Sequence, residues 1–318
     1  MNSDLNTEWF CLIAGMLHRK GVGRASIWKE INDVRAVLQV SVRSPELLSA
    51  CKKRWMPILK ADSHSIEAME RALQVIETGE FVVTFAHEHY PITLSRRLKR
   101  MAPLFFVCGG NTSLLTETAI GFCGSRKSSE SSASLAYQCA ESLAELGLVV
   151  VAGNARGIDK TAHVAALEAG GSTVLVLPEG YPSRAANWVS HYGDSKRVLV
   201  VSEFFPWDKW TVARAMQRNW TITGLSEAII VVQAGLPSGS YEAGLAALEQ
   251  GTPCFTIQME EYPSEYKGNE ELLRKGAVPL RTSGSELDSQ SFKNLMASSE
   301  PLWRFYRTDD AQPNLFED

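Results

Sequence analysis

Long apolar runs are missing from this 318-residue sequence. Runs such as residues 148–152 and 228–232 are far shorter than the roughly 18 residues of a membrane span, so no membrane association is expected. The first nine residues, MNSDLNTEW, lack the basic start and apolar core of a secretion signal. We therefore expect a cytoplasmic protein.

Paired cysteines and an excess of positive charge are also absent. The six cysteines show no CxxC spacing, which argues against a zinc site or a disulfide framework and fits a reducing compartment. Lysine and arginine number 32 against 36 acidic residues, so no global field attracts nucleic acid and any anion site must be local. His87 and His89 flank Glu88 without a further metal-ligand pattern, and no metal is expected.

Two standard nucleotide-binding motifs are missing as well. The sequence contains no GxGxxG, which disfavours NAD and FAD, and no GxxxxGK[ST], which excludes a P-loop NTPase. No cofactor is therefore expected.

The first 80 residues are expected to form a small all-α domain. Apolar residues at helical spacing predict a helix over residues 5–19 and a second one ending near residue 38. Between them, Gly21-Val22-Gly23 resembles the turn of a SAM or helix–hairpin–helix domain. Such a turn can offer bare N–H groups to a phosphate, although a turn that only packs is the simpler interpretation.

Residues 81–284 change to alternating strands and helices. Apolar runs at 119–123, 148–152, 173–177, 198–201, 228–232 and 254–257 predict buried strands, with helices between most of them. This alternation favours an α/β fold, a Rossmann-like, mostly parallel sheet with helices on both faces. Residues 285–318 form a tail with seven acidic and three basic residues.

Ligands of open α/β sheets bind beyond the carboxyl ends of the strands. Three strand ends here carry small or basic residues that suit phosphate, since glycine permits close backbone approach and arginine presents a fork of donors. Asp159 is expected to cap the helix that bears His163, a packing residue. The candidate residues are Gly124, Ser125 and Arg126, then Gly153, Arg156, Gly157 and Lys160, and finally Ser238, Gly239 and Ser240.

These segments occur in an order that identifies a family. GFCGSR, VVVAGNARGIDKTAHVAALEAGG, VVSEFFP, RNWTITGLSEAIIVV and SGSYEAGLAALEQG resemble the signature of the DprA/Smf DNA-processing family, and the resemblance spans about residues 9–280. It implies a homodimer without a catalytic residue that binds single-stranded DNA and hands it to the RecA recombinase. Arg126, Arg156, and Arg218 with Asn219 would contact phosphates, and residues 238–240 would close the pocket.

The chain also departs from that signature. Trp220 follows Arg218-Asn219 where a further arginine is usual, and Glu242 places a carboxylate near the rim. Fewer phosphate contacts imply weaker, micromolar-type binding. Trp188, Trp207, Trp210 and Trp220 could stack bases, although burial is the simpler expectation for each.

Two other functions stay open. A nucleotide-binding sensor or phosphoribosyl-hydrolysing enzyme could use Glu242 as its acid or base, although its register does not match such hydrolases. Alternatively, short aromatic patches in the tail, at residues 301–306 and 314–316, could dock on a partner or shield the basic rim. A partner such as a toxin in a defence module would belong to this second class.

Overall fold

The computed structural model describes residues 2–77, 81–184, 187, 196–283, 286–287, 291, 294–295 and 297. Its strands are β1 (Phe81–Thr84), β2 (Phe105–Gly110), β3 (Ala119–Cys123), β4 (Val149–Ala152), β5 (Thr173–Leu177), β6 (Val198–Ser202), β7 (Ala228–Val231), β8 (Cys254–Ile257), β9 (Val278–Leu280), β10 (Thr282–Ser283) and β11 (Glu286–Leu287).

The α-helices are α1 (Asn2–His18), α2 (Arg24–Leu38), α3 (Pro45–Leu59), α4 (Ser63–Glu77), α5 (Ile92–Leu98), α6 (Glu130–Glu145), α7 (Ile158–Glu168), α8 (Val212–Leu225), α9 (Gly239–Gln250) and α10 (Lys267–Arg274). Short 3₁₀ turns lie at η1 (Lys99–Met101), η2 (Thr112–Thr116) and η4 (Ser264–Tyr266).

Nine strands form one sheet in the order β1-β2-β6-β5-β4-β3-β7-β8-β9. The chain runs outward from β3 through β4 and β5 to β6, and then returns to place β7 on the other side of β3. Strands β3 to β9 pair in parallel, whereas β2 is antiparallel to β6 and to β1. The predicted, mostly parallel Rossmann-like sheet is thus confirmed, with a switch of strand order between β3 and β7.

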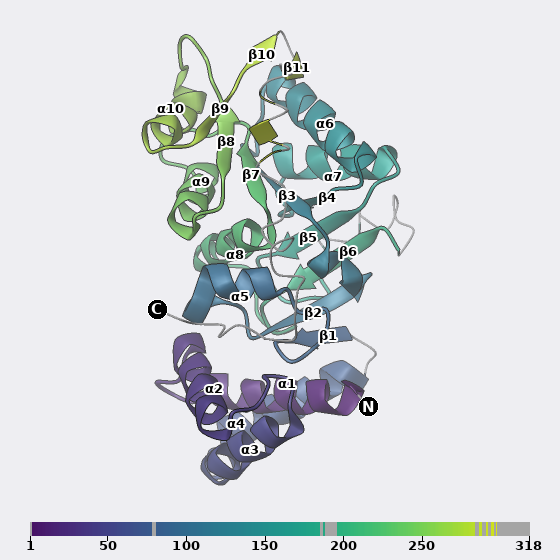
Figure 1. Cartoon of the computed structure of the whole chain (residues 1–318), viewed down its shortest axis with the longest axis vertical. Coiled ribbons are helices and arrows are strands. Elements are labelled where there is room, and N and C mark those ends of the chain that lie inside the picture. Colours follow the sequence, from purple (N-terminus) through teal and green to yellow (C-terminus); the bar gives the residue numbers. More distant parts are fainter. Residues whose placement is uncertain are drawn as a thin grey trace.

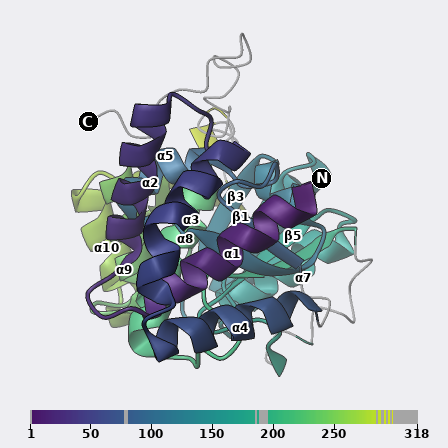
Figure 2. The same cartoon turned by 90° about the horizontal axis from the view of Figure 1, so that it is seen from below.

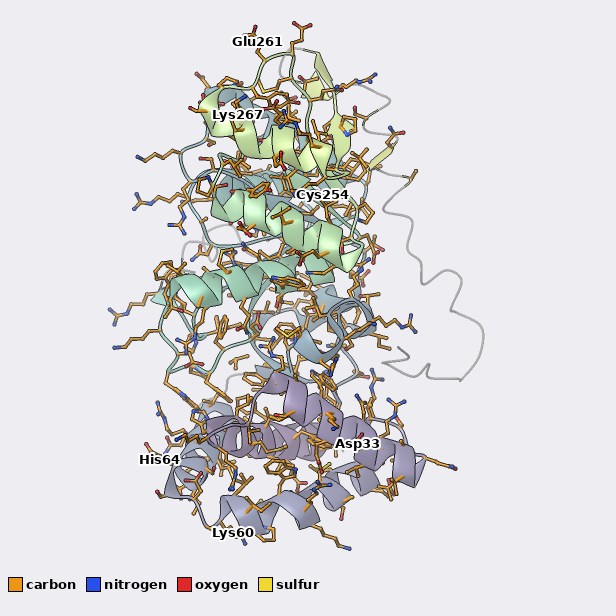
Figure 3. All side chains as sticks on the ribbon, turned by 90° about the vertical axis from the view of Figure 1, so that its left-hand side faces the viewer. Asp33, Lys60, His64, Cys254, Glu261 and Lys267 are labelled. Atoms are coloured by element: carbon orange, nitrogen blue, oxygen red, sulfur yellow. The ribbon has the colours of Figure 1, made fainter. Side chains whose placement is uncertain are left out.

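The strands are apolar throughout because both faces of the sheet are covered. In β4, Val150 and Ala152 pack into the core under α6 and α7, whereas Val149 and Val151 belong to the core on the opposite face. Helices α8, α9 and α10 lie on that opposite face, one above another (Figures 1 and 3). Cys254 of β8 is buried behind them.

The four N-terminal helices pack as one group below the edge formed by β1 and β2 (Figures 1 and 2). Phe10 of α1 contacts Phe105 edge-on at 4.9 Å between ring centroids. Asn6 also accepts hydrogen bonds from the backbone N–H and the hydroxyl of Thr84, at 2.8 and 2.7 Å. These helices therefore share an apolar core with the antiparallel edge of the sheet.

The predicted Gly21-Val22-Gly23 turn joins α1 to α2. Gly21 has a φ of 81°, which glycine adopts without strain, and Gly23 is the N-cap of α2. Within the described residues, no helix is long and apolar enough to cross a membrane, and no cluster of three or more metal-ligating side chains occurs. All six cysteines are free thiols.

Asn269 of α10 ties the end of β7 to its neighbours. Its fully buried amide donates to the carbonyls of Val231 and Val232 and to the Thr256 hydroxyl, and its Oδ1 accepts from the N–H of Ala234. Asn269→Ala removes these hydrogen bonds and leaves the Ala234 N–H without this partner, although the Thr256 hydroxyl still donates to the Val231 carbonyl. The substitution is expected to lower the free energy of unfolding by about 2–4 kcal/mol. An unchanged urea midpoint would contradict this assignment.

Candidate functional site

A cavity of about 530 Å³ lies beyond the carboxyl ends of β3, β4 and β5. The loop after each of these strands contributes to it, together with α8 and the residues before α8. This is the edge at which open α/β sheets bind ligands. Its lining residues are Arg126, Lys127, Asn154, Ala155, Arg156, Pro178, Glu179, Trp210 and Arg218.

The loops after β3 and β4 interlock through glycines. Gly157 has a φ of 76°, and a Cβ added there would lie 2.3 Å from the carbonyl oxygen of Ser125. A Cβ on Gly124 would collide with Ile158 at 2.4 Å. This close backbone approach brings Arg126 and Arg156, both exposed, to the same cavity. The predicted convergence of these two arginines with Arg218 is therefore observed.

Arg218 forms the deep part of the cavity. Only 7 % of the residue is exposed, and its Nη1 lies 3.4 Å from the Val176 carbonyl oxygen and 3.9 Å from Asp159 Oδ2. The guanidinium lies directly over Gly153, where an added Cβ would be 1.4 Å from Nη1. Its buried Nε has no hydrogen-bond partner in the described part of the chain. A buried donor without a partner is costly to the folded state.

Asp159 lies beneath this guanidinium and is almost fully buried. Burial raises its pKa to about 6, although the neighbouring Arg218 acts in the opposite direction. The expectation that Asp159 caps α7 is wrong. Gly157 is the N-cap, and Asp159 stands in the first turn, where its Oδ2 accepts from the N–H of Ala155 at 3.4 Å.

His163 is a packing residue, as expected. Its ring is fully buried, with Nδ1 2.6 Å from the Thr173 hydroxyl and Nε2 2.8 Å from the Gly153 carbonyl oxygen. Burial lowers its pKa to about 4. The neutral ring therefore supports the Gly153 loop from below.

The remaining predicted residues lie outside the cavity lining. Lys160 is exposed on α7. Asn219 is buried and donates to the Gly239 carbonyl at 3.2 Å, while Ser238 caps α9 by accepting from the N–H of Tyr241. Ser240 is buried in the first turn of α9. The 238–240 segment thus contacts Asn219, the neighbour of Arg218, but none of its residues lines the cavity.

The four tryptophans have separate environments. Trp210 is 46 % exposed and lines the cavity. Trp207 stacks on Phe205 with 4.8 Å between ring centroids, and the guanidinium carbon of Arg71 in α4 lies over the Trp207 ring, 4.1 Å from its centroid. Trp220 packs against the core, and Trp188 lies outside the described residues. Only Trp210, among those described, is placed to meet a ligand in the cavity.

Sequence reasoning missed Glu179, which lines the cavity from the loop after β5. The rule that found the other loops, namely that ligands meet the carboxyl ends of strands, also applies to this one. The cavity therefore combines four cationic side chains with one carboxylate. Glu242, by contrast, is exposed on α9 and does not line it.

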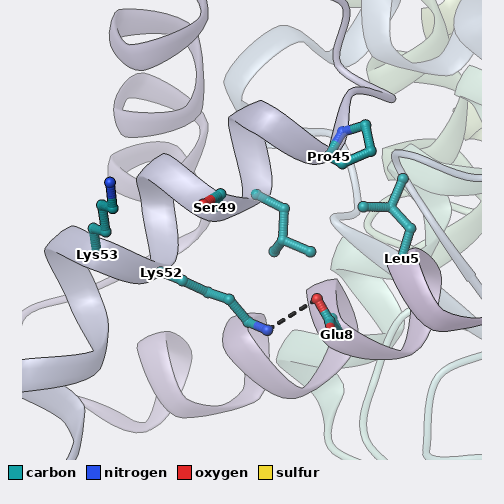
Figure 4. Close-up of a pocket in the computed structure, with 7 residues that line it drawn as sticks. Leu5, Glu8, Pro45, Ser49, Lys52 and Lys53 are labelled. Carbon is teal, nitrogen blue, oxygen red and sulfur yellow. Dashed lines mark ion pairs between the residues drawn. The ribbon is translucent and has the colours of Figure 1, made fainter.

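A second hollow, of about 560 Å³, lies between α1 and α3 (Figure 4). Leu5, Pro45 and Leu48 form its apolar part, and Lys52 pairs with Glu8 at 2.9 Å. Because that ion pair is already neutral, this hollow lacks the concentrated positive charge of the cavity at the sheet.

Comparison with known proteins gives the family. The sequence model of one protein family, DNA recombination-mediator protein A, matches residues 81–289, about two thirds of the chain. The chain belongs to this family. The predicted DprA/Smf resemblance is therefore confirmed, and the matched residues include all three loops that line the cavity.

Individual relatives agree with this assignment. The DNA processing protein DprA of Streptococcus pneumoniae is 33 % identical over 190 residues, which cover 58 % of this chain and 66 % of that protein. An X-ray structure of DprA from the same species gives a TM-score of 0.67 at 26 % identity, over 91 % of this chain and 97 % of that one.

A second solved structure is described as showing the single-stranded DNA binding mode of DprA from Helicobacter pylori. Its TM-score is 0.56 at 26 % identity, over 69 % of this chain and 96 % of that one. The fold of that protein therefore resembles the fold of this chain over nearly all of its own length.

Asp159→Asn tests the burial of the carboxyl group. A folded-state pKa of about 6, raised above the usual 3.8, means that the unfolded state loses its proton first as pH rises. Stability therefore falls between pH 4 and pH 6. The variant lacks this loss, so its unfolding free energy relative to wild type should rise by about 2–3 kcal/mol between pH 4 and pH 7. Urea unfolding at several pH values measures this, and a difference that does not change with pH would refute it.

Proposed function

We propose that this chain binds single-stranded DNA and holds its phosphates in the cavity beyond β3, β4 and β5. The observation that carries the proposal is the gathering of two exposed arginines and one lysine in the same cavity as the buried guanidinium of Arg218, whose Nε has no partner among the described residues. The H. pylori relative, described as binding single-stranded DNA, supports the choice of ligand.

The three arginines lie at different depths in the cavity and would contact different phosphates. Arg218 is fixed by burial and would meet one phosphate with its guanidinium at the floor of the cavity, whereas the exposed Arg126 and Arg156 would meet neighbouring phosphates at the rim. Arginine suits this task because its planar fork can donate two parallel hydrogen bonds to a phosphate. The half-exposed Trp210 offers a ring face to a base, worth about 1–3 kcal/mol per stacked base.

The other predicted residues would extend this site. Gly124, Ser125, Gly153 and Gly157 would keep the backbone close to the strand of DNA. Lys160, Asn219 and the 238–240 segment lie beside the cavity and would guide the strand as it leaves, a role argued only from their position next to the lining residues.

We further propose that the protein binds DNA without catalysing a reaction. The acid considered for a hydrolase, Glu242, is exposed outside the cavity lining, so no observation favours the nucleotide-hydrolase alternative. A homodimer, delivery of DNA to RecA and a cytoplasmic location remain proposals that follow from the family. The toxin partner and the role of the acidic tail, which lies almost wholly outside the described residues, stay predictions.

Arg126→Ala tests the phosphate contact. We expect the variant to bind a 20-nucleotide mixed-sequence strand several-fold more weakly at low salt. The slope of log affinity against log salt should also become shallower by about 0.7, the value for one lost contact. Fluorescence anisotropy at several salt concentrations measures both quantities.

Arg274→Ala is the matched control, since it removes an exposed arginine that pairs with Glu270 on α10. It changes the net charge equally and should leave both the affinity and the slope as in wild type. Equal effects of the two substitutions would mean that only the overall charge matters, and the proposed site would be wrong.

A further inference from the structure

Glu179 places a carboxylate in a cavity that is otherwise lined by basic side chains, which is unexpected for a site that binds only anions. It shares the cavity with Arg126, Lys127, Arg156 and Arg218, so it reduces the attraction of the cavity for phosphate. Exposed acids can simply turn into solvent, but Glu179 is half-buried and lines the cavity. An ionised carboxylate only accepts hydrogen bonds, so it suits a ligand group that donates them.

The loop that carries Glu179 is fixed from several sides. The Ser202 hydroxyl donates to the backbone oxygen of Glu179 at 2.6 Å, and the Ser183 hydroxyl donates to its Oε1. The backbone N–H of the next residue, Gly180, donates to the Asp208 carbonyl oxygen at 2.9 Å. Gly180 also lies so close to Phe205 that an added Cβ would be 2.1 Å from the backbone oxygen of Phe205. Glu179 therefore presents its carboxylate from a defined position.

Single-stranded DNA offers donors only on its bases. The phosphates and the deoxyribose within a strand have no N–H or O–H group, and an ionised carboxylate can only accept. The base edges differ in what they offer. Guanine has two adjacent donors, N1–H and N2–H, which match the two oxygens of a carboxylate. Adenine and cytosine have one amino group beside an acceptor, and thymine has one N–H between two carbonyl oxygens.

We infer that Glu179 is a base-specificity residue that makes this cavity prefer guanine, with the base stacked against Trp210 and its neighbouring phosphates on the arginines. The inference rests on the proposed binding of single-stranded DNA. The half-exposed Trp210 lines the same cavity, and stacking alone accepts every base. Glu179 would distinguish between the bases, because its carboxylate can accept hydrogen bonds from both donors of guanine and repels the carbonyl oxygens of thymine.

The test compares short strands by fluorescence anisotropy in lithium buffer, which prevents guanine quadruplexes. Wild-type protein should bind alternating (dT-dG)₆ about tenfold more tightly than (dT)₁₂, within the range for a bidentate base contact. Replacing guanine by hypoxanthine removes the N2 amino group and should lose most of this preference. Replacing it by 7-deazaguanine keeps both donors and should retain the preference.

Glu179→Gln should reduce the preference for (dT-dG)₆ to less than twofold and should strengthen binding of (dT)₁₂, because a repulsive charge is removed. Glu249→Gln is the matched control. Glu249 is exposed near the end of α9 and does not line the cavity, so this variant should keep the wild-type preference.

Three results would overturn the inference while leaving DNA binding intact. The first is equal affinity for all strands, and the second is a guanine preference that survives Glu179→Gln. The third is tighter binding of (rU)₁₂ than of (dT)₁₂ that is lost in Glu179→Gln, because the carboxylate would then recognise a ribose hydroxyl. If wild-type protein binds none of the strands at low salt, the proposed function itself fails.

Discussion

The burial of one guanidinium group determines how this site is built. Arg218 belongs to α8, and its side chain lies beside the end of β5. Only 7 % of the residue is exposed, and its Nε has no hydrogen-bond partner in the described part of the chain. A charged group in this position loses its hydration, which costs several kcal/mol unless other groups compensate. Asp159 compensates only in part, because its nearest oxygen is 3.9 Å away and burial raises its own pKa to about 6.

The surrounding fold accommodates this group. Gly153 must lack a side chain because the guanidinium lies where its Cβ would be, and His163 supports the same loop from below with its hydrogen bond to the Gly153 carbonyl. Gly157 lets the β4 loop pass close to the β3 loop, so that Arg126 and Arg156 reach the same cavity as Arg218. The glycines of this family signature thus have a packing reason that is independent of any direct contact with DNA.

Much of the sheet was predictable because buried parallel strands are uninterrupted apolar runs. Residues 119–123, 173–177 and 254–257 were expected as strands with the bounds that β3, β5 and β8 have. The interlocking of the loops was not predictable, since a positive φ and a backbone contact between Gly157 and Ser125 depend on how two strands lie side by side. Glu179 was missed for a different reason. Its loop follows a predicted strand as the other two do, but a carboxylate does not suit a phosphate site, and the folded chain places it in the same cavity as the arginines.

The central claim is that the proposed site holds a phosphate of DNA against Arg218, and a crystal structure of the protein with a bound oligonucleotide tests it most directly. The account predicts a phosphate oxygen at about 2.7–2.9 Å from a nitrogen of the Arg218 guanidinium, the usual length of a charge-assisted hydrogen bond, with Arg126 and Arg156 on adjacent phosphates. A strand of DNA bound elsewhere on the molecule, with Arg218 unchanged and its Nε still unpaired, would contradict it.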